Sequence, residues 1–427
     1  MLGSSVSILF LLIALSVPIA AVLGILALVL AEIYSPMPLF RALGDIYWTN
    51  SIDFILVAIP LFIMMGEILL RAGIAEKMYG ALSNWLSWLP GGLMHSNIGA
   101  STLFAATSGS SIATAATVGT VAMPQARKEG YFEPLFMGTL AAGGTLGILI
   151  PPSINMIVYG LLTNTSVPKL YLAGFLPGFL LAGLFMLTVL IACLIRPEWG
   201  GKKRSPTWAA RISTLPDLLP PLFIFLVVVG SIYAGLATPT EAASLGVVAS
   251  LLLAAVNRKL NMPMLLRAIE GTMRTTAMVM LIVLAAMFLN FVLSVIGLTA
   301  LLTAFITDMG LSPMQTMIVI VIGFLILGCF MEAFSLLLIA TPLIAPIVAA
   351  MGYDLVWFGI LMMLLLETAL ITPPIGVNLY VIQGVRGYGS MNDVILGALP
   401  FVIAMLLMIV ALLVFPQIAL WLPEAIG

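Results

Sequence analysis

The stretch "GILIPPSIN", residues 147–155, decides the fold, because two adjacent prolines interrupt a strongly apolar run. The stretch "LITPPIGVN", residues 370–378, repeats the pattern, and 222 positions separate Pro151 from Pro373. A proline inside a helix removes a backbone donor and frees a carbonyl one turn earlier, so two in succession end the helix. The pair therefore predicts two membrane helices that are broken at related positions.

The composition is that of a polytopic membrane protein. Of the 427 residues, 62% are hydrophobic and only 8% are charged, which leaves too little polar surface for a soluble globule. A helix needs about 20 apolar residues to cross the bilayer, so roughly ten to twelve crossings are expected. An all-α fold is favoured over a barrel, which would show short alternating strands. Residues 6–31 are too long for a signal peptide and predict one retained first helix.

The chain divides into segments around two hairpins that are predicted to enter the membrane and return. Residues 96–124 are rich in Gly, Ser and Thr at the middle, as two half-helices meeting at a polar turn would be. Residues 312–346 form the counterpart, since Pro124 and Pro346, and likewise Ser110 and Glu332, also lie 222 positions apart. We expect an N-terminal helix and connection, a first repeat, a loop, central scaffold helices and a second repeat, at 1–50, 51–195, 196–217, 218–275 and 276–427.

Basic residues in short loops indicate orientation, since they prefer the cytoplasm. The loop 196–211 contains five of them, and Arg127 and Lys128 follow the first hairpin, which places both on the cytoplasmic side. Residues 275–385 contain no Lys or Arg, whereas Asp308 and Asp354 flank the second hairpin, whose base should face outward. Two similar halves with opposite charge bias predict an inverted repeat.

The broken helices have a chemical use. Free carbonyls in lipid are tolerated where something binds them, and a desolvated Na⁺ takes several oxygen ligands. Each half-helix after a break also points the positive end of its dipole inward, which favours a carboxylate. Two symmetric breaks thus predict two cation sites around one substrate site at mid-membrane. The alternative is a pair of packing kinks, which the duplication disfavours.

Four acidic residues in apolar surroundings need separate interpretations, because a buried acid is costly. Glu332 is either a cation ligand or a hydrogen-bonded glutamate that stabilises the hairpin turn. Glu367 is either a partner of the site or a packing acid. Glu241 should cap a helix with Thr238 or Thr240, and Glu67 should pair with Arg71 four residues on.

Polar side chains near the breaks are candidate substrate contacts. Ser153 and Asn155 follow the first break, Asn378 follows the second, and Thr114 lies in the first hairpin. These groups either bind substrate or satisfy carbonyls of neighbouring helices. Arg386 either anchors its segment or, less favoured, meets a substrate carboxylate.

Other functions find little support in the residues. The net charge is −1 and no basic arm is present, so nucleic acid is not an expected partner. Cys193 and Cys329 lie in apolar runs as buried thiols would. The single histidine, His95, falls in an apparent loop, which excludes a histidine-cluster metal site and leaves a membrane enzyme without its base.

An ordered set of motifs resembles the large membrane subunit of tripartite ATP-independent periplasmic (TRAP) transporters. The motifs cover nearly the whole chain: "SGSS" at 108–111, "GILIPPSINMIVYG" at 147–160, "LAGFLPG" at 172–178, "ATPTEAA" at 237–243 and "LITPPIGVNLYV" at 370–381. The resemblance implies a Na⁺-coupled secondary importer of the bacterial inner membrane with an elevator mechanism. It also implies two partners, a small four-helix membrane subunit and a periplasmic substrate-binding protein.

The resemblance further implies two Na⁺ sites and a class of substrate. One site would use Ser108 and Ser110 with carbonyls near Gly147, Ile150 and Pro151. The other would use Glu332 with carbonyls near Ile371, Thr372 and Pro374. Family members mainly carry organic acids, including C4-dicarboxylates, sialic acids and other sugar acids, and compatible solutes such as ectoine. The substrate of this chain stays open, because selectivity lies largely in the binding protein.

Three alternatives stand beside this hypothesis. A proton-coupled transporter of the same architecture would route protons through Glu332 or Glu367. An ion channel would also use backbone carbonyls, but no repeated filter sequence is present. A membrane-embedded enzyme would need a nucleophile beside a base, and no such pair is suggested near the breaks.

Overall fold

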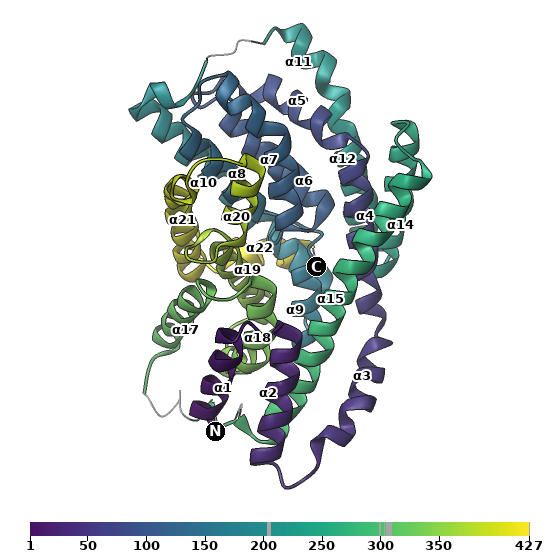
Figure 1. The fold of residues 1–427 in the computed structure, drawn as a ribbon, viewed down its shortest axis with the longest axis vertical. Helices are drawn as coiled ribbons and strands as arrows, with labels where there is room; N and C mark the ends of the chain where they lie inside the picture. The colour runs from purple at the N-terminus through teal and green to yellow at the C-terminus, as the bar shows by residue number, and fades with distance from the viewer. Residues whose placement is uncertain (203–205, 299, 303, 305–309, 427) are drawn as a thin grey trace.

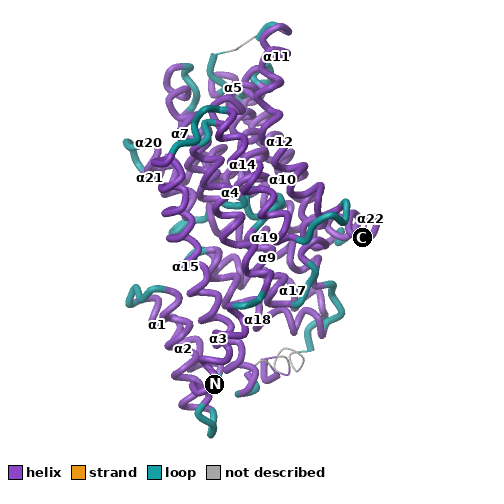
Figure 2. Tube along the Cα trace, turned by 90° about the vertical axis from the view of Figure 1, so that its right-hand side faces the viewer, coloured by secondary structure: helices purple, strands orange, loops and turns teal. Residues whose placement is uncertain are grey.

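The computed structural model describes residues 1–202, 206–298, 300–302, 304 and 310–426, and among these it contains helices and loops without a strand (Figures 1 and 2). The longer helices are α1 Leu2–Ala14, α2 Ile19–Tyr34, α3 Leu43–Ser51, α4 Ala58–Arg71, α5 Ile74–Leu86, α6 Leu93–Ser108, α7 Ser111–Lys128, α8 Glu133–Thr145, α9 Ile154–Thr163, α10 Val167–Ile195, α14 Pro239–Val256, α15 Met262–Val295, α17 Pro313–Gly328, α18 Ala333–Ala350, α19 Leu355–Ile371, α20 Val377–Arg386, α21 Met391–Val414 and α22 Gln417–Ile426. Shorter helical pieces are α11 Trp208–Thr214, α12 Leu219–Phe225, α13 Ser231–Tyr233, the 3₁₀ turns Leu39–Ala42, Phe54–Val57, Pro197–Trp199 and Leu215–Leu218, and the π turn Leu226–Gly230.

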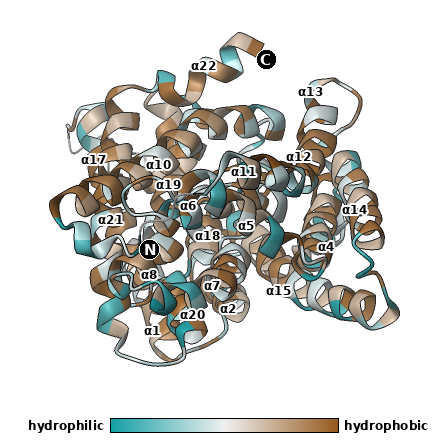
Figure 3. Ribbon diagram, turned by 90° about the horizontal axis from the view of Figure 1, so that it is seen from above, coloured by the Kyte–Doolittle hydropathy of each residue, from teal (hydrophilic) through white to brown (hydrophobic). Residues whose placement is uncertain are grey.

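The helices have the length and surface of membrane spans. Seven helical stretches of the described chain are long and apolar enough to cross a bilayer. Large hydrophobic side chains are exposed along many of them, including Leu252 on α14 and Leu407 on α21. Seen from above, hydrophobic residues occupy the periphery of the bundle as well as its interior (Figure 3). This distribution confirms the prediction of an all-α membrane protein, since a lipid-facing surface has no need of polar groups.

The prediction of one helix over 6–31 was wrong, because the chain breaks between α1 and α2. Ser16 adopts a left-handed φ of 57°, and Pro18 is the residue immediately before α2. Proline lacks a backbone N–H and disfavours helical geometry in the residue before it, so the helix cannot continue through Pro18. The apolar run therefore makes two packed helices.

Two helical hairpins lie in opposite halves of the molecule. Helices α6 and α7 lie in the upper half of Figure 1, and α17 and α18 lie in the lower half. Pro124 and Pro346, expected as hairpin limits, instead lie inside α7 and α18, which continue for about one further turn. Prolines are tolerated within membrane helices where neighbouring groups satisfy the freed carbonyls. Asp308, used for the orientation of the second hairpin, falls outside the described residues, as do Lys203 and Arg204.

Both double prolines interrupt helices at the predicted places. Helix α8 ends at Thr145 and α9 begins at Ile154, while α19 ends at Ile371 and α20 begins at Val377. Both Pro-Pro peptide bonds are cis. Residues 146–154 are buried throughout, whereas Pro374 and Ile375 in the second break are exposed. The two breaks thus share a backbone pattern and differ in their surroundings.

Helices from the two halves of the sequence pack into one body around the breaks. A Cβ at Gly138 in α8 would collide with the carbonyl of Gly397 in α21, so only glycine permits this approach. The Nδ2 of Asn378 in α20 donates to the carbonyl of Ala141 in α8, at 3.1 Å. Helix α15 runs unbroken from Met262 to Val295, across the expected segment boundary at 275/276.

Candidate functional site

The tips of the two hairpins meet at one cavity of about 480 Å³. The first tip contributes residues 109–112 and the second contributes residues 332–335. The remaining wall comes from the first break and α9, from α15, from Leu370 near the end of α19, and from Ile19 at the start of α2. The cavity therefore lies where segments far apart in the sequence converge.

The first tip is a short turn held by hydroxyl groups. Ser108 and Thr114 share a hydrogen bond of 2.9 Å between their hydroxyls, and Thr114 Oγ1 donates to the carbonyl of Ser110 at 2.7 Å. The Ser110 hydroxyl accepts from the backbone N–H of Ala113 at 3.4 Å and caps α7. Gly109 has φ +60°, a conformation that glycine adopts without strain. Three hydroxyl oxygens and one carbonyl oxygen thus gather at one turn.

The first break packs directly against this tip. A Cβ at Gly147 would lie 2.8 Å from the carbonyl carbon of Ser110, and one at Gly109 would lie 2.8 Å from the carbonyl oxygen of Pro152. The hydroxyl of Ser111 donates to the carbonyl of Thr145 at 3.0 Å. The structure therefore brings Ser108 and Ser110 beside the unwound segment that contains Gly147, Ile150 and Pro151.

The second tip is capped by a carboxylate. Glu332 is the N-cap residue of α18, and its Oε2 accepts from the backbone N–H of Ser335 at 2.9 Å and from the hydroxyl of Ser335 at 3.2 Å. One of the two expected roles of Glu332, stabilising the turn by hydrogen bonding, is therefore present. A carboxylate has two acceptor oxygens, so Oε1 can accept from or coordinate a further group.

The second break contacts the same hairpin through its backbone. The N–H of Ile375 donates to the carbonyl of Cys329 at 3.3 Å, and Leu370 lines the cavity together with Glu332. The Thr372 hydroxyl donates back to the carbonyl of Thr368 at 2.6 Å. Ile371 is buried, whereas Thr372 is half-buried and Pro374 is exposed. Glu332 thus lies on the hairpin that touches the second break.

The expected substrate contacts occupy different surroundings. Asn155 lines the cavity. Ser153 is buried with no hydrogen-bonding partner for its hydroxyl among the described residues, and it does not line the cavity. The Thr114 hydroxyl is hydrogen-bonded within the first hairpin. Asn378 donates to the carbonyl of Ala141 in α8, so it has the alternative role expected for it, which is to satisfy a carbonyl of a neighbouring helix.

The other acids follow their expected structural roles, with one exception. Glu241 and Thr238 form a capping box at the start of α14, and Glu67 pairs with Arg71, both as predicted. Glu367 is 0% exposed. Its carboxyl group faces the backbone of Leu149 in the first break, outside hydrogen-bonding geometry. A buried acid with no side-chain partner among the described residues is rare in proteins, so Glu367 remains a functional candidate.

Arg386 belongs to an ion-pair cluster and does not face the cavity. Its guanidinium is 7% exposed and donates to Glu133 at 3.0 Å and to Asp393 at 2.9 Å. Arg127 also donates to Glu133 at 3.0 Å, and both arginines lie over the ring of Tyr388. The cluster ties the ends of α7 and α20 to the starts of α8 and α21.

Sequence reasoning missed two parts of the site and misplaced one residue. The α15 side chains Met278 and Ile282 line the cavity, and Ser335 completes the second cap. Three of the four α15 residues that line the cavity, Met278, Val279 and Ile282, are apolar like those facing lipid, and only Thr275 is polar. His95 lies in the first turn of α6 rather than in a loop, with Nε2 2.8 Å from the carbonyl of Pro90.

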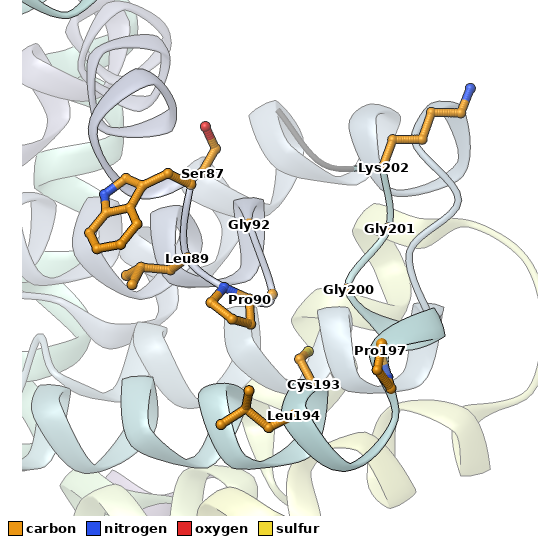
Figure 4. A pocket seen from close by; sticks show the side chains of 12 residues that line it. Ser87, Leu89, Pro90, Gly92, Cys193, Leu194, Pro197, Gly200, Gly201 and Lys202 are labelled. Carbon is orange, nitrogen blue, oxygen red and sulfur yellow. The ribbon is translucent and has the colours of Figure 1, made fainter. Parts of the chain in front are cut away.

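A second cavity, of about 320 Å³, lies between the α5–α6 turn and the segment after α10 (Figure 4). Lys202 is its charged residue, and Figure 4 shows this side chain extending away from Pro90 and Cys193. The N–H of Gly92 is bonded to the carbonyl of Leu89, and the N–H of Leu93 to the hydroxyl of Tyr131. Because the N–H groups of Gly92 and Leu93 are already hydrogen-bonded within the protein, this cavity is a weaker candidate for a substrate site than the hairpin cavity.

The polar side chains that line the hairpin cavity are not a typical ligand set for a transition metal. Its polar groups are hydroxyls, an amide and one carboxylate, and none of the described lining residues is Lys, Arg or His. The described residues contain no group of three or more His, Cys, Asp or Glu side chains that could hold a metal ion. Hydroxyl, carbonyl and carboxylate oxygens are ligands for hard cations.

Comparison with known proteins identifies the relatives of the chain. Residues 6–418 match the family model described as the DctM component of the tripartite ATP-independent periplasmic transporter. The C4-dicarboxylate TRAP transporter large permease protein DctM of Pseudomonas aeruginosa is 34% identical over 91% of this chain and 90% of its own length. The sialic acid TRAP transporter large permease protein SiaM of Vibrio cholerae is 31% identical over 87% of each.

Solved structures of other transporters share the fold. The Alcanivorax borkumensis YdaH transporter superposes with a TM-score of 0.60 at 18% identity, over 97% of this chain and 99% of that one. The MtrF protein of Neisseria gonorrhoeae superposes with a TM-score of 0.58 at 12% identity, over 93% and 94%. At these identities the likeness concerns the fold alone.

Proposed function

This chain belongs to the tripartite ATP-independent periplasmic transporter family as its DctM component, a multi-pass membrane permease, and from that membership we propose that it imports a small organic acid across the bacterial inner membrane, coupled to Na⁺. The relatives named for C4-dicarboxylates and sialic acid support the class of substrate. A periplasmic substrate-binding protein delivers the acid, and a small four-helix membrane subunit completes the transporter.

One observation carries the proposal. Both hairpin tips line a single cavity, and each tip contacts a broken helix, the first through Ser110 and Gly147 and the second through Cys329 and Ile375. A cation bound between a tip and a break would pull the two together. The substrate cavity between the tips would then be complete only when the cations are bound, which is the requirement for coupled transport.

The first Na⁺ site uses Ser108 and Ser110 with backbone oxygens of the first break, from Gly147, Ile150 and Pro151. Support comes from the close packing of Gly147 on Ser110 and from the cluster of oxygens around Ser108. The side chain of Ile150 packs against Gly178 in α10, and its N–H donates to the carbonyl of Leu146 at 2.9 Å. The group that Ile150 offers a cation is therefore its carbonyl oxygen.

The second Na⁺ site uses Glu332 with backbone oxygens of Ile371, Thr372 and Pro374. The carboxylate already accepts two hydrogen bonds from Ser335, which fix its position at the tip. The exposure of Pro374 leaves this break the more accessible of the two. We propose that this site loads or releases its ion more readily than the first.

Transport follows an elevator mechanism in this proposal. The hairpins and broken helices move as one body against α4, α14 and α15, so that the cavity opens first to one side and then to the other. The hydrogen bond between Asn378 and Ala141 and the ion pairs of Arg386 support the cohesion of the moving body.

The test is uptake into proteoliposomes that contain this chain, its small subunit and the cognate binding protein. Radiolabelled organic acid should enter only with an inward Na⁺ gradient and the binding protein. Ser110→Ala and Glu332→Gln should each raise the Na⁺ concentration for half-maximal uptake, whereas Ser244→Ala on exposed α14 serves as the matched control. Equal uptake of the organic acid with and without the Na⁺ gradient would contradict the assignment of Na⁺ as the coupling ion.

Proton coupling is the second candidate, and fully buried Glu367 is the observation that favours it. Ionisable side chains enclosed within membrane transporters often serve as proton carriers, which makes Glu367 the candidate for that role here. A proton-coupled transporter would take up substrate under a pH gradient without Na⁺, and Glu367→Gln would abolish that uptake. The same liposomes, with the pH gradient imposed in place of the Na⁺ gradient, decide between the two.

A further inference from the structure

We propose that Ile19 is a specificity-determining residue of the hairpin cavity, the space between the two tips. Its side chain closes this cavity beside the second tip and so limits the size of the apolar part of the substrate. The inference rests on the proposed function and deepens it, because it concerns how large an organic acid the permease itself accepts. It does not depend on the coupling ion or on the number of charges that the acid carries.

A smaller cavity of about 160 Å³, which we call the side cavity, adjoins the hairpin cavity at the second tip. Its wall consists of Ile13, Val17, Ile19, Phe330, Met331, Glu332 and Ser335. Three of these residues, Ile19, Glu332 and Ser335, also line the hairpin cavity. These three residues therefore form the partition between the two cavities.

Ile19 is the member of the partition that can vary without disturbing the second tip. Glu332 accepts hydrogen bonds from the N–H and the hydroxyl of Ser335, at 2.9 and 3.2 Å, so these two side chains hold the cap of α18. Ile19 is half-buried and contributes only hydrocarbon. The opening between the two cavities therefore depends on the size of the side chain at position 19.

The break in the N-terminal apolar run gives Ile19 this position. Helix α1 ends at Ala14 and α2 begins at Ile19, directly after Pro18, through which a helix cannot continue. The turn between the two helices also contributes Val17 to the side cavity. Helix α2 packs along α15, whose Met278 lines the hairpin cavity. Packing on α15 therefore fixes the start of α2 against the second tip.

The side cavity is suited to hydrocarbon. Apart from the capping pair of Glu332 and Ser335, its lining side chains are apolar. Such walls favour an alkyl group and cannot replace the water lost by a further charged group. If the partition is removed, the part of a substrate that enters the side cavity is therefore an alkyl branch. Each methylene group that moves there from water should raise the affinity about fourfold.

The experiment uses succinate and its 2-ethyl, 2-butyl and 2-hexyl derivatives, which keep two carboxylates and differ in the length of one alkyl branch. The unfolding temperature of the purified full-length chain is followed against each acid in Na⁺ buffer. For the wild type, we expect stabilisation to weaken once the branch exceeds the space that Ile19 leaves. Ile19→Ala removes three carbon atoms, so 2-hexylsuccinate should bind it at least about tenfold more tightly than it binds the wild type.

Two further variants separate the role of Ile19 from a general loss of packing. Ile19→Phe enlarges the partition and should move the length limit toward shorter branches. Ile25→Ala makes the same truncation at an exposed position of α2 and should leave the limit unchanged. The unfolding temperature without added acid verifies that each variant is folded.

The same length limit in Ile19→Ala and in the wild type would overturn the inference, as would a series in which no acid stabilises either protein. Uptake that depends on Na⁺ and the binding protein is measured separately in proteoliposomes. Normal uptake together with an unchanged length limit would contradict this inference alone, whereas absence of such uptake would contradict the proposed function.

Discussion

Ser110 and Glu332 lie 222 positions apart and cap the second helix of their respective hairpins, each accepting a hydrogen bond from the backbone N–H three residues on. Both residues line the same cavity. Equivalent positions therefore carry a hydroxyl on one tip and a carboxylate on the other. The two tips are alike in backbone and different in charge, which makes their roles separable by mutation.

The cap at Glu332 should contribute to folding apart from transport. Glu332→Ala removes the acceptor for Ser335 and should lower the free energy of unfolding by about 0.5–2 kcal/mol. Glu332→Gln should retain most of that stability because its amide oxygen still accepts. Thermal unfolding of both variants checks this expectation, and equal losses in the two would show that charge rather than capping stabilises the tip.

Gly147 should be intolerant of a side chain. Gly147→Ala places a Cβ within 2.9 Å of Ser110 O and Ser111 N, so the first hairpin must move away from the break. Because the contact atoms are backbone, we expect loss of Na⁺-dependent uptake. Gly183→Ala in α10, where nothing lies within 4 Å of the added Cβ, is the matched control. Normal uptake by Gly147→Ala would argue against a site between hairpin and break.

Asn378 should act through packing between the two halves. Asn378→Ala leaves the carbonyl of Ala141 without this donor and should cost about 1–3 kcal/mol of stability. Asn392→Ala, exposed at the start of α21, should cost little. If Asn378→Ala instead left thermal stability intact and weakened only substrate response, Asn378 would be a substrate contact after all.

The Glu133 cluster should make stability depend on acid pH. Burial alone would raise the pKa of Glu133, but hydrogen bonds from Arg127 and Arg386 outweigh it and lower the pKa below 4.5. The Glu133 carboxylate thus takes up a proton less readily in the folded state than in the unfolded state. Its contribution to the free energy of unfolding is therefore complete above the unfolded-state pKa and is lost as the pH falls through the lowered folded-state pKa.

Glu133→Gln provides the measurement. The variant should lose about 1–3 kcal/mol at neutral pH because Arg386 keeps only Asp393 as a charged partner. Its unfolding temperature should also fall less steeply than that of the wild type below about pH 5. Glu424→Gln, exposed in α22, is the control. Parallel pH profiles for wild type and Glu133→Gln would contradict the ion-pair account.

The sequence by itself determined the membrane class, the two breaks and the two tips. Proline geometry at 151–152 and 373–374 and the polar turns at Ser110 and Glu332 act locally, so their effect on the backbone follows from the residues alone. The same local logic placed the capping box of Glu241 and the pair of Glu67 with Arg71. It failed at Pro18, where a single proline in a long apolar run ended a helix expected to continue.

Only the tertiary structure decided which side chains share the cavity. Asn155 faces it while Asn378 turns to a neighbouring carbonyl, although both follow a double proline. The mostly apolar helix α15 supplies one wall of the cavity. Buried Glu367, from a helix far along the chain, faces the first break. In a membrane protein the lipid and the protein interior are equally apolar, so the hydrophobic pattern of a helix does not show which of its sides faces the interior. The packing of the helices in the tertiary structure decides this orientation.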